Sequence, residues 1–104
     1  MAKAIVSKEA RKDLIAIRMY IRDELLNPAA ADRILHELRR AVEGLQSFPR
    51  QGKSLDAMIT VHTEYRYLPC VDFCIFYLEN DEGVVIVRIL HQKQDHLHAL
   101  FLQK

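Results

Sequence analysis

The sequence lacks a net charge of either sign. Lysine and arginine total 15 and aspartate and glutamate total 14, which gives a formal net charge of +1 at pH 7. A protein that holds nucleic acid mainly through phosphates usually carries a clear basic excess. The small surplus lies in the first half, because residues 53–104 carry five Lys/Arg against seven Asp/Glu. This balance argues against nucleic-acid binding by bulk charge.

Long hydrophobic runs are also missing. No stretch of 18 or more apolar residues occurs, whereas a membrane-spanning helix needs about 20. The opening sequence MAKAIVSKEARKDL has no signal-peptide core, since charges interrupt it at once. We therefore expect a cytosolic protein that forms one domain over residues 1–104.

Cysteine is scarce, and the chain has only Cys70 and Cys74. Their C-x3-C spacing lacks a second Cys/His pair nearby, and Asp95, His96 and His98 do not form a recognisable ligand pattern. We expect both cysteines to be reduced packing residues, as unpaired cysteines commonly are. No metal and no cofactor are expected.

The first half of the chain has the spacing of two helices. Residues 3–6 are a short strand candidate, and Ser7 suits the N-cap of a following helix. Apolar residues in steps of three and four then predict one buried face; they are Ala10, Leu14, Ile17, Ile21 and Leu25. Asn27 and Pro28 end this helix and start a second one, predicted over residues 28–46. Two helices with so short a connection form an antiparallel hairpin.

The second half has the pattern of a sheet. Residues 47–56 are predicted to be a loop, and the alternation in residues 59–68 predicts a half-buried strand. Pro69 either ends that strand or lies at a sheet edge. Residues 73–79 and 84–90 are apolar on both faces, which predicts central strands covered on each side.

Residues 80–83 are predicted to be the hairpin turn between these two strands. Residues 94–102 form either a short final helix or a tail packed along the sheet. The order strand, helix, helix, strand, strand, strand predicts an α+β fold: a small, mainly antiparallel sheet with the helical hairpin on one face.

Three segments, in sequence order, resemble parts of a known family. The family's first helix is matched by SKEARKDLIAIRMYI, and its second helix and following loop by ADRILHELRRAVEGLQSFPRQG. Its sheet is matched by EYRYLPCVDFCIFYLENDEGVVIVRILHQKQD. The chain thus resembles, over nearly its whole length, toxins of the RelE/ParE superfamily, which belong to bacterial type II toxin–antitoxin (plasmid stabilization) systems. The superfamily's strand–helix–helix–sheet fold agrees with the elements predicted above.

The resemblance implies one of two activities. RelE-like members cut messenger RNA on the ribosome without a metal, whereas ParE-like members inhibit DNA gyrase and have no demonstrated nuclease chemistry. Both are silenced by an antitoxin that wraps an extended segment around the toxin, so a cognate antitoxin is implied. A homodimer or a heterotetramer with the antitoxin is the expected assembly. The near-zero net charge favours the ParE-like activity, and the RelE-like endoribonuclease is the alternative.

Metal-free RNA cleavage needs a base, an acid and a cation that holds the phosphate. RelE-like enzymes typically place an arginine on the strand that corresponds to residues 73–77, where this sequence has Cys74 among apolar neighbours. A second cation follows the last strand, and here it is Lys93, which cannot bind a phosphate in bidentate fashion. The missing arginine weighs against the enzymatic alternative.

If the protein is a nuclease, the resemblance and the residue types name four candidate catalytic residues. Arg66 and Lys93 would hold the phosphate, and His91 or His98 would move protons, since imidazole titrates near neutral pH. In the structural alternative, His91 closes the last strand through a hydrogen bond while His96 and His98 lie on solvated turns.

Three further cations are candidates for substrate binding. Arg50 and Lys53 lie in the predicted loop beside the sheet, where solvated charges are the commoner case. Arg88 stands in an apolar strand, and a buried arginine requires a partner. Arg88 therefore either pairs with a carboxylate such as Glu64 or Asp72, or contacts an anion.

Overall fold

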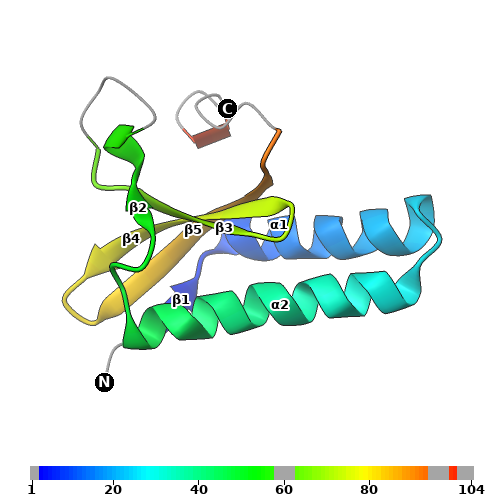
Figure 1. The fold of residues 1–104 in the computed structure, drawn as a ribbon, viewed down its shortest axis with the longest axis horizontal. Coiled ribbons are helices and arrows are strands. Elements are labelled where there is room, and N and C mark those ends of the chain that lie inside the picture. The colour runs from blue at the N-terminus through cyan, green and yellow to red at the C-terminus, as the bar shows by residue number, and fades with distance from the viewer. Residues whose placement is uncertain (1–2, 58–62, 94–98, 101–104) are drawn as a thin grey trace.

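A five-stranded sheet with a helical hairpin on one face is the framework of the molecule, whose computed structural model describes residues 3–57, 63–93 and 99–100 (Figure 1). The strands are β1 (Lys3–Val6), β2 (Lys53–Ser54), β3 (Arg66–Cys70), β4 (Phe73–Asn80) and β5 (Gly83–His91). Their order is β1-β5-β4-β3-β2. Only the β1–β5 pairing in this sheet is parallel. The predicted α+β fold with a mainly antiparallel sheet is confirmed.

The helical hairpin begins and turns at the predicted caps. Its helices are α1 (Lys8–Met19) and α2 (Pro28–Ser47). The Ser7 hydroxyl accepts a hydrogen bond from the Ala10 N–H at 3.1 Å, and Asn27 Oδ1 accepts one from the Ala30 N–H at 3.1 Å. Each cap satisfies an N–H that has no partner within its helix. Ser7 Oγ also donates to the Val87 carbonyl at 3.0 Å, which ties the start of α1 to β5.

The tip of the hairpin differs from the regular helix predicted there. The last turn before the connection is a π-helix, η1 (Tyr20–Glu24), in which the Leu25 N–H donates to the Tyr20 carbonyl at 3.3 Å. Leu26 has a φ of 51°, a conformation that strains a leucine. Both helices extend past the strands, so this tip projects beyond the sheet (Figure 1).

Both faces of the sheet are buried, as predicted for the two central strands. The helix-side core packs against α1 and α2 and contains Leu38, Leu45, Ile75, Tyr77 and Ile86, among others. The outer core lies on the opposite face and contains Leu55, Cys74, Phe76 and Leu90. The short 3-10 helix η2 (Leu55–Ala57) and residues 99–100 lie on this second side (Figure 1). Each fully buried aliphatic side chain stabilises the fold by about 1.5–3 kcal/mol.

Three strand boundaries differ from the prediction. β2 lies inside the predicted loop of residues 47–56, and β3 begins only at Arg66; residues 58–62 are outside the described part of the chain. Pro69 does not end β3 but pairs with Cys74. β2 covers only Arg66 and Tyr67, so Pro69, which lacks an N–H, lies at an uncovered edge as the second alternative predicted.

The predicted tail of residues 94–102 is described only at Ala99 and Leu100, which pack against the outer core. Among the residues that the structure describes, no helix combines the length and the apolar character that a membrane crossing requires.

Candidate functional site

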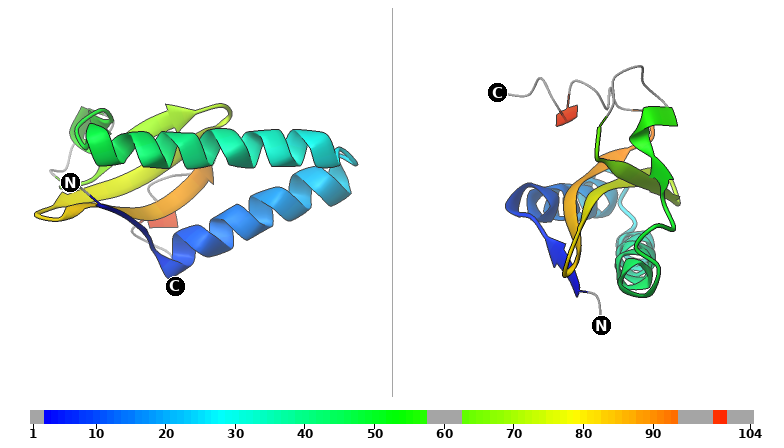
Figure 2. Two further views of the ribbon diagram at one scale, coloured as in Figure 1. Left: turned by 90° about the horizontal axis from the view of Figure 1, so that it is seen from below. Right: turned by 90° about the vertical axis from the view of Figure 1, so that its left-hand side faces the viewer.

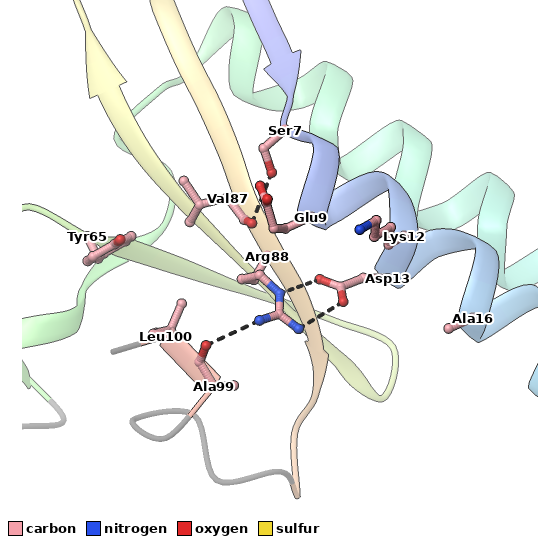
Figure 3. Close-up of a pocket in the computed structure, with 10 residues that line it drawn as sticks. All are labelled: Ser7, Glu9, Lys12, Asp13, Ala16, Tyr65, Val87, Arg88, Ala99 and Leu100. Carbon is pink, nitrogen blue, oxygen red and sulfur yellow. Dashed lines mark hydrogen bonds and ion pairs between the residues drawn. The ribbon is translucent and has the colours of Figure 1, made fainter. Parts of the chain in front are cut away.

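Arg88 is held by a carboxylate from the first helix. Its Nε donates to Asp13 Oδ2 at 2.8 Å, its Nη2 donates to Asp13 Oδ1 at 3.0 Å, and its Nη1 donates to the Ala99 carbonyl at 3.2 Å (Figure 3). Asp13 Oδ2 also accepts from the Ile89 N–H at 2.9 Å. The side chains of Arg88 and Asp13 are 16% and 14% exposed. The hydrogen bond to Asp13 raises the pKa of the Arg88 guanidinium.

The prediction that Arg88 pairs with a carboxylate is confirmed, but the proposed partners were wrong. The partner is Asp13 rather than Glu64 or Asp72. The reason is a β-bulge: Phe76 pairs with Arg88 whereas Tyr77 pairs with Ile86, so the residue between them is extra on β5. A bulge re-aims the side chains beside it, and here Arg88 points to α1.

A polar cleft of about 780 Å³ surrounds this ion pair. Ser7, Glu9 and Lys12 from the start of α1 line it together with Asp13 and Arg88 (Figure 3). The guanidinium is already engaged by Asp13 and Ala99, and a second carboxylate, Glu9, lies nearby. The cleft is therefore a poor place for Arg88 to bind a phosphate, because its charge is neutralised from within the fold.

Arg66 lies at a tightly packed corner of the sheet. Its Nη1 donates to the Gly52 carbonyl at 2.8 Å. At the same corner the Tyr77 hydroxyl donates to the Pro49 carbonyl at 2.7 Å and accepts from the Gly52 N–H at 2.8 Å. Burial raises the pKa of Tyr77, and the Gly52 hydrogen bond and the Arg66 charge oppose this shift only in part. These hydrogen bonds hold the loop that precedes β2 in place, and Arg66 lies beside that loop.

Arg50 and Lys53 lie at the same corner as Arg66 but are directed differently. Arg50 Nε lies 3.1 Å from Glu79 Oε1 in an exposed ion pair. Lys53 pairs with Tyr67, whose side chain packs on the outer core, while Arg66 is the neighbour of Tyr67 on β3. Since successive strand residues point to opposite faces, Lys53 and Arg66 lie on opposite sides of the sheet. The structure brings these three cations to one corner but not to one surface.

His91 and Lys93 lie at the other end of the sheet. The Lys93 N–H donates to His91 Nδ1 at 3.1 Å, which closes the end of β5 as the structural alternative for His91 predicted. The His91 ring also packs edge-on against Phe73, with centroids 5.5 Å apart. His98, the other candidate for proton transfer, lies outside the described residues, as do Asp95 and His96.

The structure does not bring Arg66 together with His91 and Lys93. β3 and β5 flank β4 on opposite sides; Arg66 pairs with Tyr77 and His91 pairs with Phe73. Four residues along a strand span about 13 Å and two strand spacings about 10 Å, so the Arg66 and His91 Cα atoms are about 16 Å apart. A phosphate held by Arg66 would be out of reach of the His91 ring.

Both cysteines are free packing residues, as expected. Cys70 packs against the helix-side core and its thiol donates to the Glu37 carbonyl at 3.6 Å, while Cys74 is buried in the outer core. Burial raises the pKa of both thiols. Within residues 3–57, 63–93 and 99–100, no group of three or more His, Cys, Asp or Glu side chains is arranged to hold a metal ion.

Two surfaces of the helical hairpin were not predicted. One is the projecting tip, where Met19, Tyr20, Leu25 and Leu26 are at least half exposed. The other is an apolar groove of about 300 Å³ between α1 and α2, which we call the interhelix groove. It is lined by Val6, Leu14, Ile15, Arg18, Leu35, Leu38, Arg39, Val42 and Ile89. The sequence signal for both was the apolar residues outside the predicted buried face of the first helix, such as Ile15 and Met19. The prediction that Leu25 lies on the buried face was wrong, because the regular helix ends at Met19 and a π-helix follows, and Leu25 is 57% exposed.

Comparison with known proteins identifies the family. A family model described as the ParE toxin of the type II toxin–antitoxin system, parDE, matches residues 4–96. The chain is 33% identical over 66 residues to "Toxin ParE1" of Mycobacterium tuberculosis, from strains CDC 1551 / Oshkosh and ATCC 25618 / H37Rv. This match covers 62% of the chain and 64% of the length of each relative.

A solved structure has the same fold. It is described as the chromosomal ParDE TA system from P. aeruginosa, and it superposes with a TM-score of 0.73 at 22% sequence identity. The match covers 88% of this chain and 96% of the other. Because the family model extends over nearly all the described elements, the chain belongs to the family of ParE toxins of type II toxin–antitoxin systems.

Proposed function

We propose that the protein inhibits growth as a ParE-like toxin, by binding DNA gyrase, and that a cognate antitoxin neutralises it. The observation that carries this proposal is the match of the ParE family model to residues 4–96. The relatives from M. tuberculosis, named as ParE toxins, point the same way. In this proposal the protein acts in the cytosol, where it meets both its target and its antitoxin.

The distribution of cations supports binding rather than RNA cleavage. Arg88 is neutralised by Asp13, and Arg66 lies about 16 Å from His91 by the strand register. General acid–base cleavage needs these groups within hydrogen-bonding reach of one phosphate. Inhibition by binding needs no such convergence, so the separated cations favour the ParE-like activity.

A two-part experiment tests the target. The protein is induced in cells and the ends of transcripts are mapped, while the purified protein is added to a gyrase supercoiling assay. The expected result is blocked supercoiling with intact messages. Codon-positioned cuts in translated messages with normal supercoiling would overturn the gyrase assignment in favour of the endoribonuclease, and unchanged growth with neither effect would overturn both.

The antitoxin is tested by co-expression with the small gene that lies next to the toxin gene. We expect the two products to co-purify and growth to be restored. Light scattering of the purified complex then distinguishes a heterotetramer from a one-to-one pair, and light scattering of the toxin alone detects a homodimer. Separate elution of the two proteins with no rescue of growth would remove the antitoxin from the proposal.

A further inference from the structure

Two apolar residues have a backbone conformation that suits neither of them. Leu26, in the connection between α1 and α2, has a φ of 51°, and Val71, in the turn between β3 and β4, has a φ of 56°. This left-handed region is unfavourable for a leucine and more so for a β-branched valine, whereas glycine or asparagine adopts it readily. Both side chains are also exposed, by 81% for Leu26 and 51% for Val71. Within a single copy of the chain, burial does not offset the strain at either residue.

The two strained residues border one apolar pocket of about 470 Å³, which we call the tip pocket. Leu25 and Asn27 line it on the hairpin side, and Asp72 lines it on the sheet side. Leu26 stands between the first two in sequence, and Val71 precedes the third. Neither Leu26 nor Val71 lines the pocket itself. The pocket is therefore left open by the exposed side chains that stand next to it.

Hydrogen bonds hold both strained turns in place. At the hairpin connection the Asn27 N–H donates to the Ile21 carbonyl at 3.3 Å. At the turn in the sheet, Gln92 Nε2 donates to the Val71 carbonyl at 3.1 Å. The surrounding structure thus maintains both conformations, and strain that is maintained in this way is typical of binding surfaces.

Exposed apolar side chains gather at the tip pocket. In the described part of the chain, eight large apolar side chains are exposed, and four of them line or adjoin this pocket: Tyr20, Leu25, Leu26 and Val71. Such a cluster marks an interaction surface rather than scattered exposure. The hairpin tip stands clear of the strands (Figure 2, left), so another molecule can reach it without meeting the sheet.

The charges around the tip pocket balance. Residues 18–24 hold two arginines against one aspartate and one glutamate. Arg22 and Asp23 already pair with each other, with Nε 2.8 Å from Oδ1 and Nη2 3.1 Å from Oδ2. Asp72 and Lys93 add one charge of each sign on the sheet side. A nucleic acid or an anionic membrane selects a basic surface, whereas a second copy of this chain meets no net repulsion here.

The surface is also complementary to itself. It carries a protruding apolar side chain, Leu26, beside an apolar pocket that its own chain leaves open. About a two-fold axis, both copies offer the same patch, so each Leu26 can enter the tip pocket of the other copy. Such a contact buries roughly 1000 Å² in total, which is at the low end for specific interfaces. A dimer of this size is weak and forms at micromolar concentrations.

We propose that the tip pocket is the interface of a weak homodimer, in which Leu26 of each copy fills the tip pocket of the other. Tyr20 and Leu25 pack around the inserted side chain. Removing Leu26 and Val71 from water then offsets the backbone strain that a single copy carries. This inference goes beyond the proposed function, because it assigns a surface to self-association and depends on neither gyrase nor the antitoxin.

The test is sedimentation equilibrium of the purified complete toxin between about 1 and 300 μM. We expect the wild type to shift from monomer to dimer over this range. L26N removes the inserted side chain and should raise the dissociation constant of the dimer by about 10- to 100-fold. F48N is the matched control, since it removes an equally apolar side chain that is 70% exposed at the end of α2. F48N should dimerise within about twofold of the wild type.

Thermal melting separates this role from a structural one. Asparagine adopts the left-handed conformation more readily than leucine does. At a concentration where all samples are monomeric, L26N should therefore melt at or above the temperature of the wild type. A clearly lower melting temperature would show that Leu26 stabilises the single chain, which contradicts the proposal.

A second variant fills the pocket instead of removing the side chain that enters it. Ala30 of α2 lines the tip pocket, and A30F should weaken dimerisation as L26N does. A mixture of L26N and A30F keeps one of the two contacts, because Leu26 of the A30F chain can enter the open pocket of the L26N chain. The mixture should form more dimer than either variant alone, and no gain in the mixture would overturn the reciprocal insertion.

The remaining outcomes are equally decisive. A wild type that stays monomeric over the whole range, or L26N that dimerises like the wild type, would overturn the proposal. If L26N keeps its self-association but no longer inhibits gyrase or binds the product of the adjacent gene, the surface belongs to that partner instead. Failure of the dimer leaves the proposed function untouched, since sedimentation of the toxin alone involves neither gyrase nor the antitoxin.

Discussion

Arg66 and Arg88 stand on the same small sheet but have very different surroundings. Arg88 makes a two-pronged ion pair with Asp13 and is 16% exposed. Arg66 is also only partly buried but, within the described residues, donates a single hydrogen bond, to the Gly52 carbonyl. A guanidinium has five N–H donors, so Arg66 retains donors that a ligand can use, whereas Arg88 serves the fold. The sequence shows two strand arginines, and only the packing around them separates their roles.

Removing the partner of Arg88 should have the largest effect. In D13A the guanidinium loses its carboxylate and the Ile89 N–H loses its acceptor. Breaking a largely buried pair on one side costs about 3 kcal/mol or more, and urea unfolding measures this loss. The double variant D13A/R88A should lose less than the two single variants together. A D13A protein within about 1 kcal/mol of the wild type would mean that the pair behaves as a surface ion pair.

A methyl group at the Arg66 corner should have the next largest effect. A Cβ at Gly52 would lie 2.6 Å from the Tyr77 hydroxyl and 2.7 Å from the Tyr67 carbonyl. We expect G52A to lower the free energy of unfolding by about 2 kcal/mol, because the backbone of β3 must move. G44A is the matched control. Gly44 lies within α2, and a Cβ there would come no closer than 3.6 Å to its nearest neighbour, Gln51 Oε1. Alanine at this position should stabilise the helix by about 0.5–1 kcal/mol.

The Tyr77 hydroxyl should contribute about 1–2 kcal/mol, since it bridges Pro49 and Gly52. Its contribution depends on pH. The folded pKa is raised, so the unfolded chain ionises first; the stabilisation is complete below about pH 10 and is lost as the pH rises above that value.

Urea unfolding between pH 8 and 11 should show the wild type approaching Y77F in stability as the pH rises. Burial also raises the pKa of the Cys70 and Cys74 thiols, so their ionisation at high pH lowers the free energy of unfolding. This effect is the same in the wild type and in Y77F, and it cancels in the difference between them. A gap that stays constant over this range would show that Tyr77 ionises equally easily in the folded and unfolded states.

R66A should have the smallest effect on stability, below about 1 kcal/mol, because it removes one hydrogen bond at a partly exposed site. Since this variant stays folded, its growth inhibition reports on contacts that Arg66 makes with the target. A loss as large as that of D13A in the same urea titration would abolish the contrast between the two arginines.

Local patterns predicted the elements and their caps well. Ser7 and Asn27 cap their helices because capping depends on residues three apart in sequence. The apolar runs of β4 and β5 predicted burial on both faces of the sheet, and the structure shows it: Tyr77 packs in the helix-side core and Phe76 packs in the outer core.

The partner of Arg88 could not be predicted from spacing. Asp13 is 75 residues away, and the pairing depends on a bulge that adds one residue to β5 opposite the Phe76–Tyr77 step. No local pattern encodes such a shift in register. The π-helix at Tyr20–Glu24 was missed for a related reason, since its residues also fit an ordinary helix and the extra residue per turn arises from packing at the hairpin tip.

Because β1 pairs in parallel with β5, the sheet can finish folding only after β5 has been synthesised. Lys3 lies beside Gly83 and donates its N–H to the Glu82 carbonyl at 2.7 Å, although the ribosome makes these residues some 80 positions apart. During synthesis β1 emerges first and has no neighbour until β5 follows, and such long-range closures are slow. A nascent chain therefore cannot present a finished sheet, and an antitoxin already in the cell has that interval in which to meet the toxin.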